Sequence, residues 1–195
     1  IKSKNMKLGY ACINMTLQQA GGITTNRGMR QKTFNERGLP YVSELALQNV
    51  KDLETIVKWN EEMGIKLFRM SSDIFPWVTY YTLQSLPDYE EIRSILENIG
   101  KLADEYGQRL TFHPSHFNAL GSPNPVVVEK TIKELNAHSD IMDTMNLSPT
   151  VYNKINIHIG GAYGDKKATL ERWIDNYYKL NHNTQARLTV ENDDK

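Results

Sequence analysis

The chain has 195 residues, with 23 basic and 23 acidic side chains, so its formal net charge is zero. At this length folding buries roughly 70% of the surface that the unfolded chain exposes, and we predict one domain with one core. Hydrophobic residues make up 39% of the chain, which excludes a disordered protein, and no apolar run is long enough for a transmembrane helix. The single cysteine, Cys12, excludes an internal disulfide and favours a reducing compartment.

The neutral total hides an uneven distribution of charge. Residues 1–38 carry seven basic side chains and one acidic side chain, whereas the rest of the chain carries 16 basic and 22 acidic. A basic segment on a neutral protein is typical either of an anion-binding surface or of a solvated terminal loop. Composition alone leaves both interpretations open.

Strands are predicted where short apolar runs occur, and helices where apolar residues recur with helical spacing. The predicted strands are Met6–Ile13, Lys66–Ser71, Arg109–His113, Lys154–Ile159 and Arg187–Glu191. The predicted helices cover 42–63, 89–106, 126–145 and 170–177, and we expect the third to be broken near Ser139. The first two are predicted to end at Gly64 and Gly107, the second to be capped by Asp88 with Glu91 reaching back, and the fourth to begin near Asp165.

Strands that alternate with helices imply a parallel sheet connected by right-handed crossovers. Two architectures fit this order: an open doubly wound sheet, or the first part of a (β/α)8 TIM-type barrel. The first strand-to-helix turn lacks the glycine pattern of a dinucleotide-binding fold. A full barrel takes about 250 residues, so this chain would form an incomplete barrel of five strands and four helices.

Polar side chains follow three predicted strands at the ends where functional residues of such folds gather. They are His113, His158 and Glu191, each at the end of a run too apolar for the surface. Two imidazoles and a carboxylate suit a divalent transition metal, and we predict that the three converge on one metal-binding point. The alternatives are two hydrogen-bonded core histidines, and a Glu191 that pairs with Arg187 or Lys195. Two further histidines, His138 and His182, are predicted to lie at the surface.

Two loops carry further candidates. His116 and Phe117 follow Pro114, and an exposed aromatic beside a polar partner can stack on a base or pack the loop. The segment Gly160-Gly161-Ala162-Tyr163-Gly164 precedes Lys166 in the first turn of a predicted helix. This segment is either a simple turn or a phosphate-binding loop, since a helix start attracts anions.

The strand-end motifs resemble the UV damage endonuclease family. The motifs are Leu8–Thr16, Phe68–Asp73, Thr111–Phe117, His158–Lys166 and Leu188–Asp194, and the resemblance extends over essentially the whole chain. It implies a TIM-type barrel related to those of AP endonucleases and xylose isomerases. It also implies cleavage of DNA immediately 5′ to a lesion, leaving a 3′-hydroxyl, with a cluster of divalent metals that typically includes manganese; Mg²⁺, Zn²⁺ and Co²⁺ are alternatives.

The resemblance also assigns roles to residues. His113, His158 and Glu191 correspond to metal ligands, with Glu191 as the bridging carboxylate, and we expect Glu191 and Lys166 to be catalytic. The residues that it places against a lesion are Tyr10, Asn14, His116 and Phe117. The basic first segment and the helix start predict phosphate contacts by Arg27, Arg30 and Lys166. In some family members the pair at His116 and Phe117 is Gln-Tyr, so this chain differs from them in the hydrogen-bonding groups of the pair.

We therefore expect a metal-dependent DNA repair endonuclease that acts on damaged double-stranded DNA as a monomer, without a membrane. Likeness to fungal members of the family predicts that the protein is located in the nucleus. The mitochondrion and, for a bacterial protein, the cytoplasm are the alternatives. The family's remaining ligands come from strands six to eight, so we expect the protein to continue past Lys195 and the isolated 195-residue chain to be inactive. Two other functions stay open: a sugar isomerase or epimerase on a related barrel, and a non-catalytic fragment that binds damaged DNA.

Overall fold

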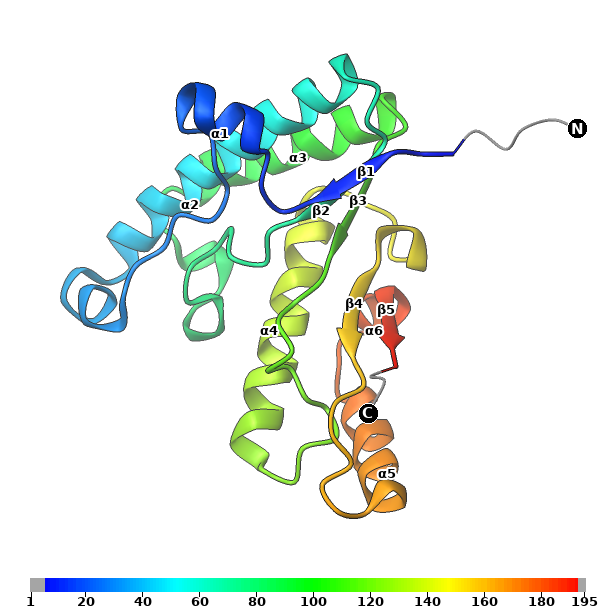
Figure 1. Ribbon diagram of the computed structural model, residues 1–195. Coiled ribbons are helices and arrows are strands. Elements are labelled where there is room, and N and C mark those ends of the chain that lie inside the picture. Colours follow the sequence, from blue (N-terminus) through cyan, green and yellow to red (C-terminus); the bar gives the residue numbers. More distant parts are fainter. Residues whose placement is uncertain (1–5, 193–195) are drawn as a thin grey trace, which may run out of the picture.

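The computed structural model describes residues 6–192 and contains one five-stranded parallel sheet in the order β1-β2-β3-β4-β5. The strands are β1 (Gly9–Ala11), β2 (Leu67–Met70), β3 (Arg109–Phe112), β4 (Ile155–His158) and β5 (Leu188–Glu191). A strand order that follows the chain has no point where the winding direction reverses, as a doubly wound sheet must have. The sheet therefore has the order of a TIM-type barrel, and the five strands form part of one (Figure 1).

The described residues contain six α-helices, two more than the sequence pattern predicted. They are α1 (Met15–Gly21), α2 (Gln31–Glu62), α3 (Tyr89–Glu105), α4 (Pro125–Thr144), α5 (Lys166–Tyr177) and α6 (His182–Arg187). Short 3₁₀ turns lie at Val78–Tyr80, Leu83–Ser85 and Val151–Asn153. The pattern missed α1, in which no residue is buried, and the short polar α6, because neither has an apolar stripe.

The first helices pack on each other and on the sheet. Helix α2 contains a kink at Gly38, whose φ of 61° is accessible to glycine, and Pro40 follows it. Its buried stripe from Val42 to Val57 is the one that the sequence predicted, and the helix ends before Gly64. Figure 1 shows α2 and α3 lying side by side along the N-terminal strands.

The core lies between the helices and one face of the sheet. On the strands, fully buried Phe68, Met70, Leu110, Phe112, Ile155 and Ile157 form this face. Along β4, Asn156 and His158 alternate with Ile155 and Ile157, so they lie on the opposite, inner face. The inner face of β4 is thus polar, and it leads to the strand ends.

Helix α4 corrects two predictions. It runs unbroken through Ser139, and the Ser139 hydroxyl and carbonyl both accept hydrogen bonds from the buried Arg187 guanidinium, at 2.7 and 3.1 Å. His138 is not at the surface but only 1% exposed, with Nδ1 donating to the Glu134 carbonyl and the ring edge-on to Phe112. The bond at Nδ1 satisfies one ring nitrogen, whereas Nε2 is buried without a partner among the described residues. His182 is exposed, as predicted.

The predicted helix caps were partly correct. Asp165 caps α5, with Oδ1 accepting from the Ala168 amide at 3.0 Å. Asp88 occupies the N-cap position of α3, but its side chain accepts from the Ser43 hydroxyl instead of capping the helix. Glu91 pairs with Lys51 of α2, so the capping box does not form and both carboxylates hold α2 and α3 together.

No helix within residues 6–192 combines the length and the apolar character needed to cross a membrane.

Candidate metal centre

Three side chains from three neighbouring strands meet at the carboxyl-terminal edge of the sheet. His113 directly follows β3, whereas His158 and Glu191 are the last residues of β4 and β5. The β4–β5 register pairs His158 with Glu191, which places the two side chains side by side. Because all these strands are parallel, their carboxyl ends lie at the same edge, and the prediction that the three residues converge is confirmed.

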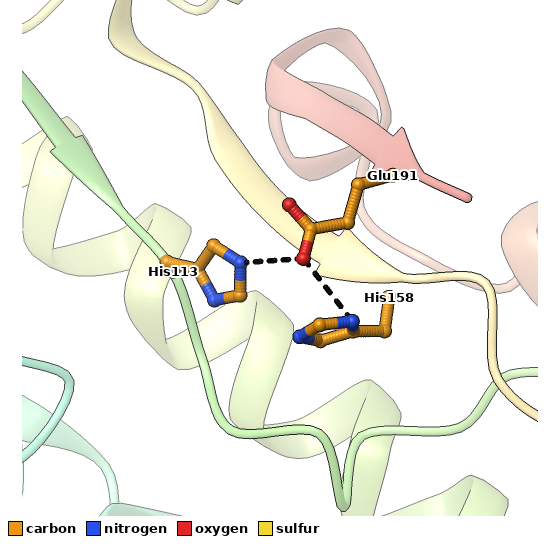
Figure 2. Close-up of side chains that lie close together, drawn as sticks. All are labelled: His113, His158 and Glu191. Atoms are coloured by element: carbon orange, nitrogen blue, oxygen red, sulfur yellow. Dashed lines mark hydrogen bonds and ion pairs between the residues drawn. The ribbon is translucent and has the colours of Figure 1, made fainter. Parts of the chain in front are cut away.

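The carboxylate of Glu191 lies between the two imidazole rings (Figure 2). Its Oε1 is 3.2 Å from His113 Nε2 and 3.1 Å from His158 Nδ1. The three potential ligand atoms all lie within 4.8 Å of one another. The histidine rings are edge-on, with centroids 5.1 Å apart. The separation of the three ligand atoms is close to that of three ligands of one metal ion, since metal–ligand bonds are about 2.0–2.3 Å long.

The hydrogen bond on the far side of His113 determines which ring nitrogen is free. Nδ1 lies 3.2 Å from the carbonyl oxygen of Pro114, which can only accept, so Nδ1 carries the proton. In the neutral ring Nε2 is then an acceptor, and it faces another acceptor, Glu191 Oε1. Two facing lone pairs need a cation or a proton beside them. The donor set therefore fits a divalent metal, and a histidine that donates its other N–H to a backbone carbonyl is typical of metal ligands.

The surroundings keep Glu191 ionised. The contact with His113 is the largest influence and lowers the pKa of Glu191; desolvation raises it, and the hydrogen bond from Asn156 and the charge of the nearby imidazoles lower it further. The His113, His158 and Glu191 side chains are 18%, 30% and 42% exposed, so the site is open to solvent and to solutes. An ionised carboxylate beside two imidazoles, within reach of a substrate, is suited to metal-assisted hydrolysis.

Asn156 belongs to this site, although the sequence reading did not single it out. Its Nδ2 donates to Glu191 Oε2 at 2.8 Å, and its Oδ1 accepts from the Thr189 hydroxyl at 2.7 Å. The alternation Ile-Asn-Ile-His along β4 was the available signal, because it places Asn156 on the face of His158.

Comparison with known proteins identifies the family. The family model described as UV-endonuclease UvdE matches residues 6–195. The chain belongs to this family.

Relatives and a solved structure agree with this assignment. The chain is 40% identical to the UV-damage endonuclease of Schizosaccharomyces pombe, with 96% of the chain and 32% of that protein covered. It is 38% identical to a putative UV-damage endonuclease of Acanthamoeba polyphaga mimivirus, covering 97% of the chain and 57% of the relative. The crystal structure of SacUVDE superposes with a TM-score of 0.85 at 30% identity, covering 97% of this chain and 62% of that one. The chain therefore spans between about a third and three fifths of the length of these proteins.

The resemblance to the UvdE family predicted that several residues face the DNA. Two of them, His116 and Phe117, are exposed, as predicted. Phe117 is 76% exposed, and its ring centroid lies 4.2 Å from that of His116. Both follow the metal-site residue His113 by a few positions, so they lie beside the strand-end edge. The loop also borders a cavity of about 670 Å³ together with Tyr163 and Lys130.

Tyr10 and Asn14 lie differently from what the UvdE-family resemblance implied. The register pairs Tyr10 with Phe68, and the Tyr10 hydroxyl donates to Asn60 of α2 at 2.7 Å, so this ring faces the helices. Asn14 is 4% exposed; its Oδ1 caps α1 through Leu17 N and its Nδ2 donates to the Tyr10 hydroxyl. Burial raises the pKa of Tyr10, and this effect is larger than the lowering by its hydrogen bonds with Asn14 and Asn60. The polar atoms of both residues form hydrogen bonds within the chain. These hydrogen bonds would have to break before either residue could bond to a lesion.

Of the three residues predicted to contact phosphates, one is bonded within the chain and two are exposed. Arg27 is paired with the buried Asp52 at 2.7 Å and donates to the carbonyls of Thr24 and Gly22, so the structure gives it an internal role instead. Arg30 and Lys166 are exposed. Lys166 begins α5 directly after the loop that follows His158, which leaves these two as the candidates for phosphate contact.

Proposed function

We propose that the protein containing this chain is a metal-dependent DNA repair endonuclease that hydrolyses the phosphodiester immediately 5′ to a UV photoproduct or another distorting lesion. The observation that carries the proposal is the convergence of His113, His158 and Glu191 in a UvdE-family chain. Relatives named UV-damage endonuclease support the proposal, and a relative from Clostridium perfringens named UV DNA damage endonuclease has DNA damage in its name. The same match favours a nuclease over a sugar isomerase on a related barrel.

The chain's own residues supply the binding of the metal and the positioning of the DNA. His113 Nε2, His158 Nδ1 and a Glu191 oxygen would hold a divalent ion, for which Mn²⁺ is proposed and Mg²⁺, Zn²⁺ or Co²⁺ are alternatives. Such ions acidify water, neutralise phosphoryl charge and stabilise the departing 3′-oxygen. The ionised Glu191 offers two oxygens and would be the bridging carboxylate if two ions bind. The exposed Lys166 and Arg30 are the proposed sources of positive charge for phosphate contacts.

The test uses the intact protein and a duplex with one defined photoproduct. With Mn²⁺ we expect a single nick immediately 5′ to the lesion, with a 3′-end that a polymerase extends, and little nicking of the undamaged duplex. Chelation should abolish nicking and added Mn²⁺ should restore it. Nicking that persists after chelation would refute the metal dependence, and binding to damaged duplex without any nicking would indicate the non-catalytic alternative.

A monomeric state and a nuclear location are also proposed, the latter because a fungal protein is among the relatives.

Lesion recognition is proposed to rest on His116 and Phe117. Replacing both by Ala is expected to weaken binding of the intact protein to a photoproduct duplex by about 10–100-fold, since a stacked aromatic contributes about 1–3 kcal/mol per base. Binding to undamaged duplex should change much less, because its bases stay stacked on one another. Fluorescence anisotropy with both duplexes measures the ratio.

Tyr178→Ala is the matched control, since Tyr178 is another highly exposed aromatic, at the end of α5. It should leave both affinities unchanged. Equal losses on damaged and undamaged duplex in the His116/Phe117 variant would mean that the two residues only pack the loop.

A further inference from the structure

We propose that Asn156 and Thr189 are positioning residues that orient the Glu191 carboxylate for the metal centre, an inference that rests on the metal site proposed above. The Thr189 hydroxyl donates to Asn156 Oδ1 at 2.7 Å, and Asn156 Nδ2 donates to Glu191 Oε2 at 2.8 Å. These two bonds form a relay from β5 through β4 and back to the end of β5.

The sheet register builds this relay. Asn156 of β4 is the register partner of Thr189 of β5, and two residues further along His158 is the partner of Glu191. Side chains two residues apart on a strand point to the same face, so the relay lies one layer below the metal-site pair on the inner face. Asn156 is 8% exposed, and both polar groups of its amide are used.

The amide has one orientation that satisfies both neighbours. With Oδ1 toward Thr189, the amide nitrogen faces the carboxylate and donates to it. In the opposite orientation the amide oxygen would face Glu191 Oε2, and two acceptors would repel each other. The Thr189 hydroxyl stabilises the first orientation because it donates its proton to Oδ1.

The relay matters because the end of a glutamate side chain is otherwise poorly fixed. The Glu191 backbone is held by its carbonyl, which accepts from Ile159 N at 3.0 Å, but the terminal torsion of Glu is broad. Asn156 holds Oε2, and Oε1 is thereby turned toward His113 and His158, as Figure 2 shows for the two oxygens. Loss of the Asn156 amide would let the carboxylate rotate away from the imidazoles.

The buried amide of Asn156 is unusual beside two apolar neighbours, and the metal site explains it. Its neighbours on β4, Ile155 and Ile157, are fully buried apolar residues that pack without needing partners. A buried amide costs free energy unless it is hydrogen-bonded, and here its donor goes to a metal-site carboxylate. Outer partners of this kind fix ligand orientation in metal sites generally.

The experiment measures Mn²⁺ affinity of the intact protein by calorimetry and by the Mn²⁺ paramagnetic resonance signal, without DNA. Asn156→Leu should weaken Mn²⁺ binding by about 10–100-fold, the usual effect of losing an outer partner of a ligand. Thr189→Val should weaken it in the same direction by less, and Thr189→Ser, which keeps the hydroxyl, should restore it. The double variant should bind about as Asn156→Leu does, because residues in series are not additive.

Thr111→Val is the matched control. Thr111 is buried on β3, and its hydroxyl has no hydrogen bond among the residues that the structure describes. This variant should bind Mn²⁺ like the wild type. The melting temperature of the chelator-treated protein is measured alongside, and for Thr189→Val we expect it to stay near that of Thr111→Val while the affinities separate.

The outcomes distinguish the relay from the metal centre itself. Normal Mn²⁺ affinity in both Asn156→Leu and Thr189→Val would overturn the relay, while a wild type that binds Mn²⁺ and loses it in His113→Ala would still support the centre. A wild type without Mn²⁺ binding, or a His113→Ala variant that binds normally, would refute the centre and the relay with it. If Asn156→Leu does not fold, the contrast between Thr189→Val and Thr189→Ser decides the question.

Discussion

Replacing Glu191 by Gln is expected to lower the rate of lesion-specific nicking by about 10³-fold or more. The substitution keeps the size of the side chain but removes the charge that two imidazoles and Asn156 surround. Charge stabilisation at a metal site contributes several kcal/mol to the transition state, and about 4 kcal/mol corresponds to roughly 10³ in rate. Single-turnover nicking of a photoproduct duplex at saturating Mn²⁺ measures the chemical step.

Glu129→Gln is the control for this change. Glu129 lies on α4, and its carboxylate pairs with Lys133 one turn away, a contact that lowers the pKa of Glu129. Neutralising this carboxylate should leave nicking unchanged, because it touches none of the metal-site residues. A Glu191→Gln protein that retained more than a tenth of the wild-type rate would show that the carboxylate does not carry the chemistry.

Replacing Arg187 by Leu is expected to lower the free energy of unfolding by about 3 kcal/mol. The Arg187 side chain is fully buried and donates to Asp143 Oδ1 at 2.6 Å, to the Ser139 hydroxyl and to the Leu147 carbonyl at 2.7 Å. Without the guanidinium the Ser139 hydroxyl and the Leu147 carbonyl lose this donor, and the Asp143 carboxylate keeps only the neutral amide of Asn183. Breaking a buried pair costs about 3–5 kcal/mol, and the lower end applies because Asp143 is 37% exposed and can regain water.

Denaturant unfolding of the intact protein measures this loss. Arg93→Leu is the control, since Arg93 also makes two carboxylate contacts, to Glu90 and Glu97, but at the surface, and it should change stability little. Removing Asp143 together with Arg187 should recover part of the loss, because no unpaired charge then remains. Equal stability of Arg187→Leu and the wild type would mean that the fold tolerates the unpaired acceptors. Because Arg187 directly precedes β5, this contact also anchors the strand that carries Glu191.

Much of the metal centre could be predicted because it follows from local patterns. Each of the runs before His113, His158 and Glu191 is too apolar for the surface, so each reads as a strand without knowledge of the others. Alternation with helices makes the strands parallel, and parallel strands end at the same edge. These patterns predict that the three side chains lie at one edge of the sheet, whereas the order β3-β4-β5 that makes them neighbours comes from the tertiary structure.

The internal contacts of the arginines and the caps could not be predicted in this way. Arg187 resembled the start of a strand and a partner for Glu191, but it bonds to residues of and just after α4 that lie about 40 to 48 positions away. Arg27 belonged to a basic segment, and only folding places it against Asp52 of α2. Asp88 had the sequence of a helix cap, and Ser43 competes for its carboxylate. In each case a partner distant in sequence provides the stronger bond.

The sequence by itself determined the alternation of strands and helices, the candidate ligands at the strand ends and the exposed pair His116 and Phe117. Only the tertiary structure decided between an open sheet and part of a barrel, because strand order depends on which edges pair. It also turned Tyr10 toward α2 and brought Asn156 and Thr189 together under Glu191. Local pattern specifies which residues form a strand, whereas the register between strands specifies which side chains share a face and meet. That register depends on hydrogen bonds between segments far apart in the chain.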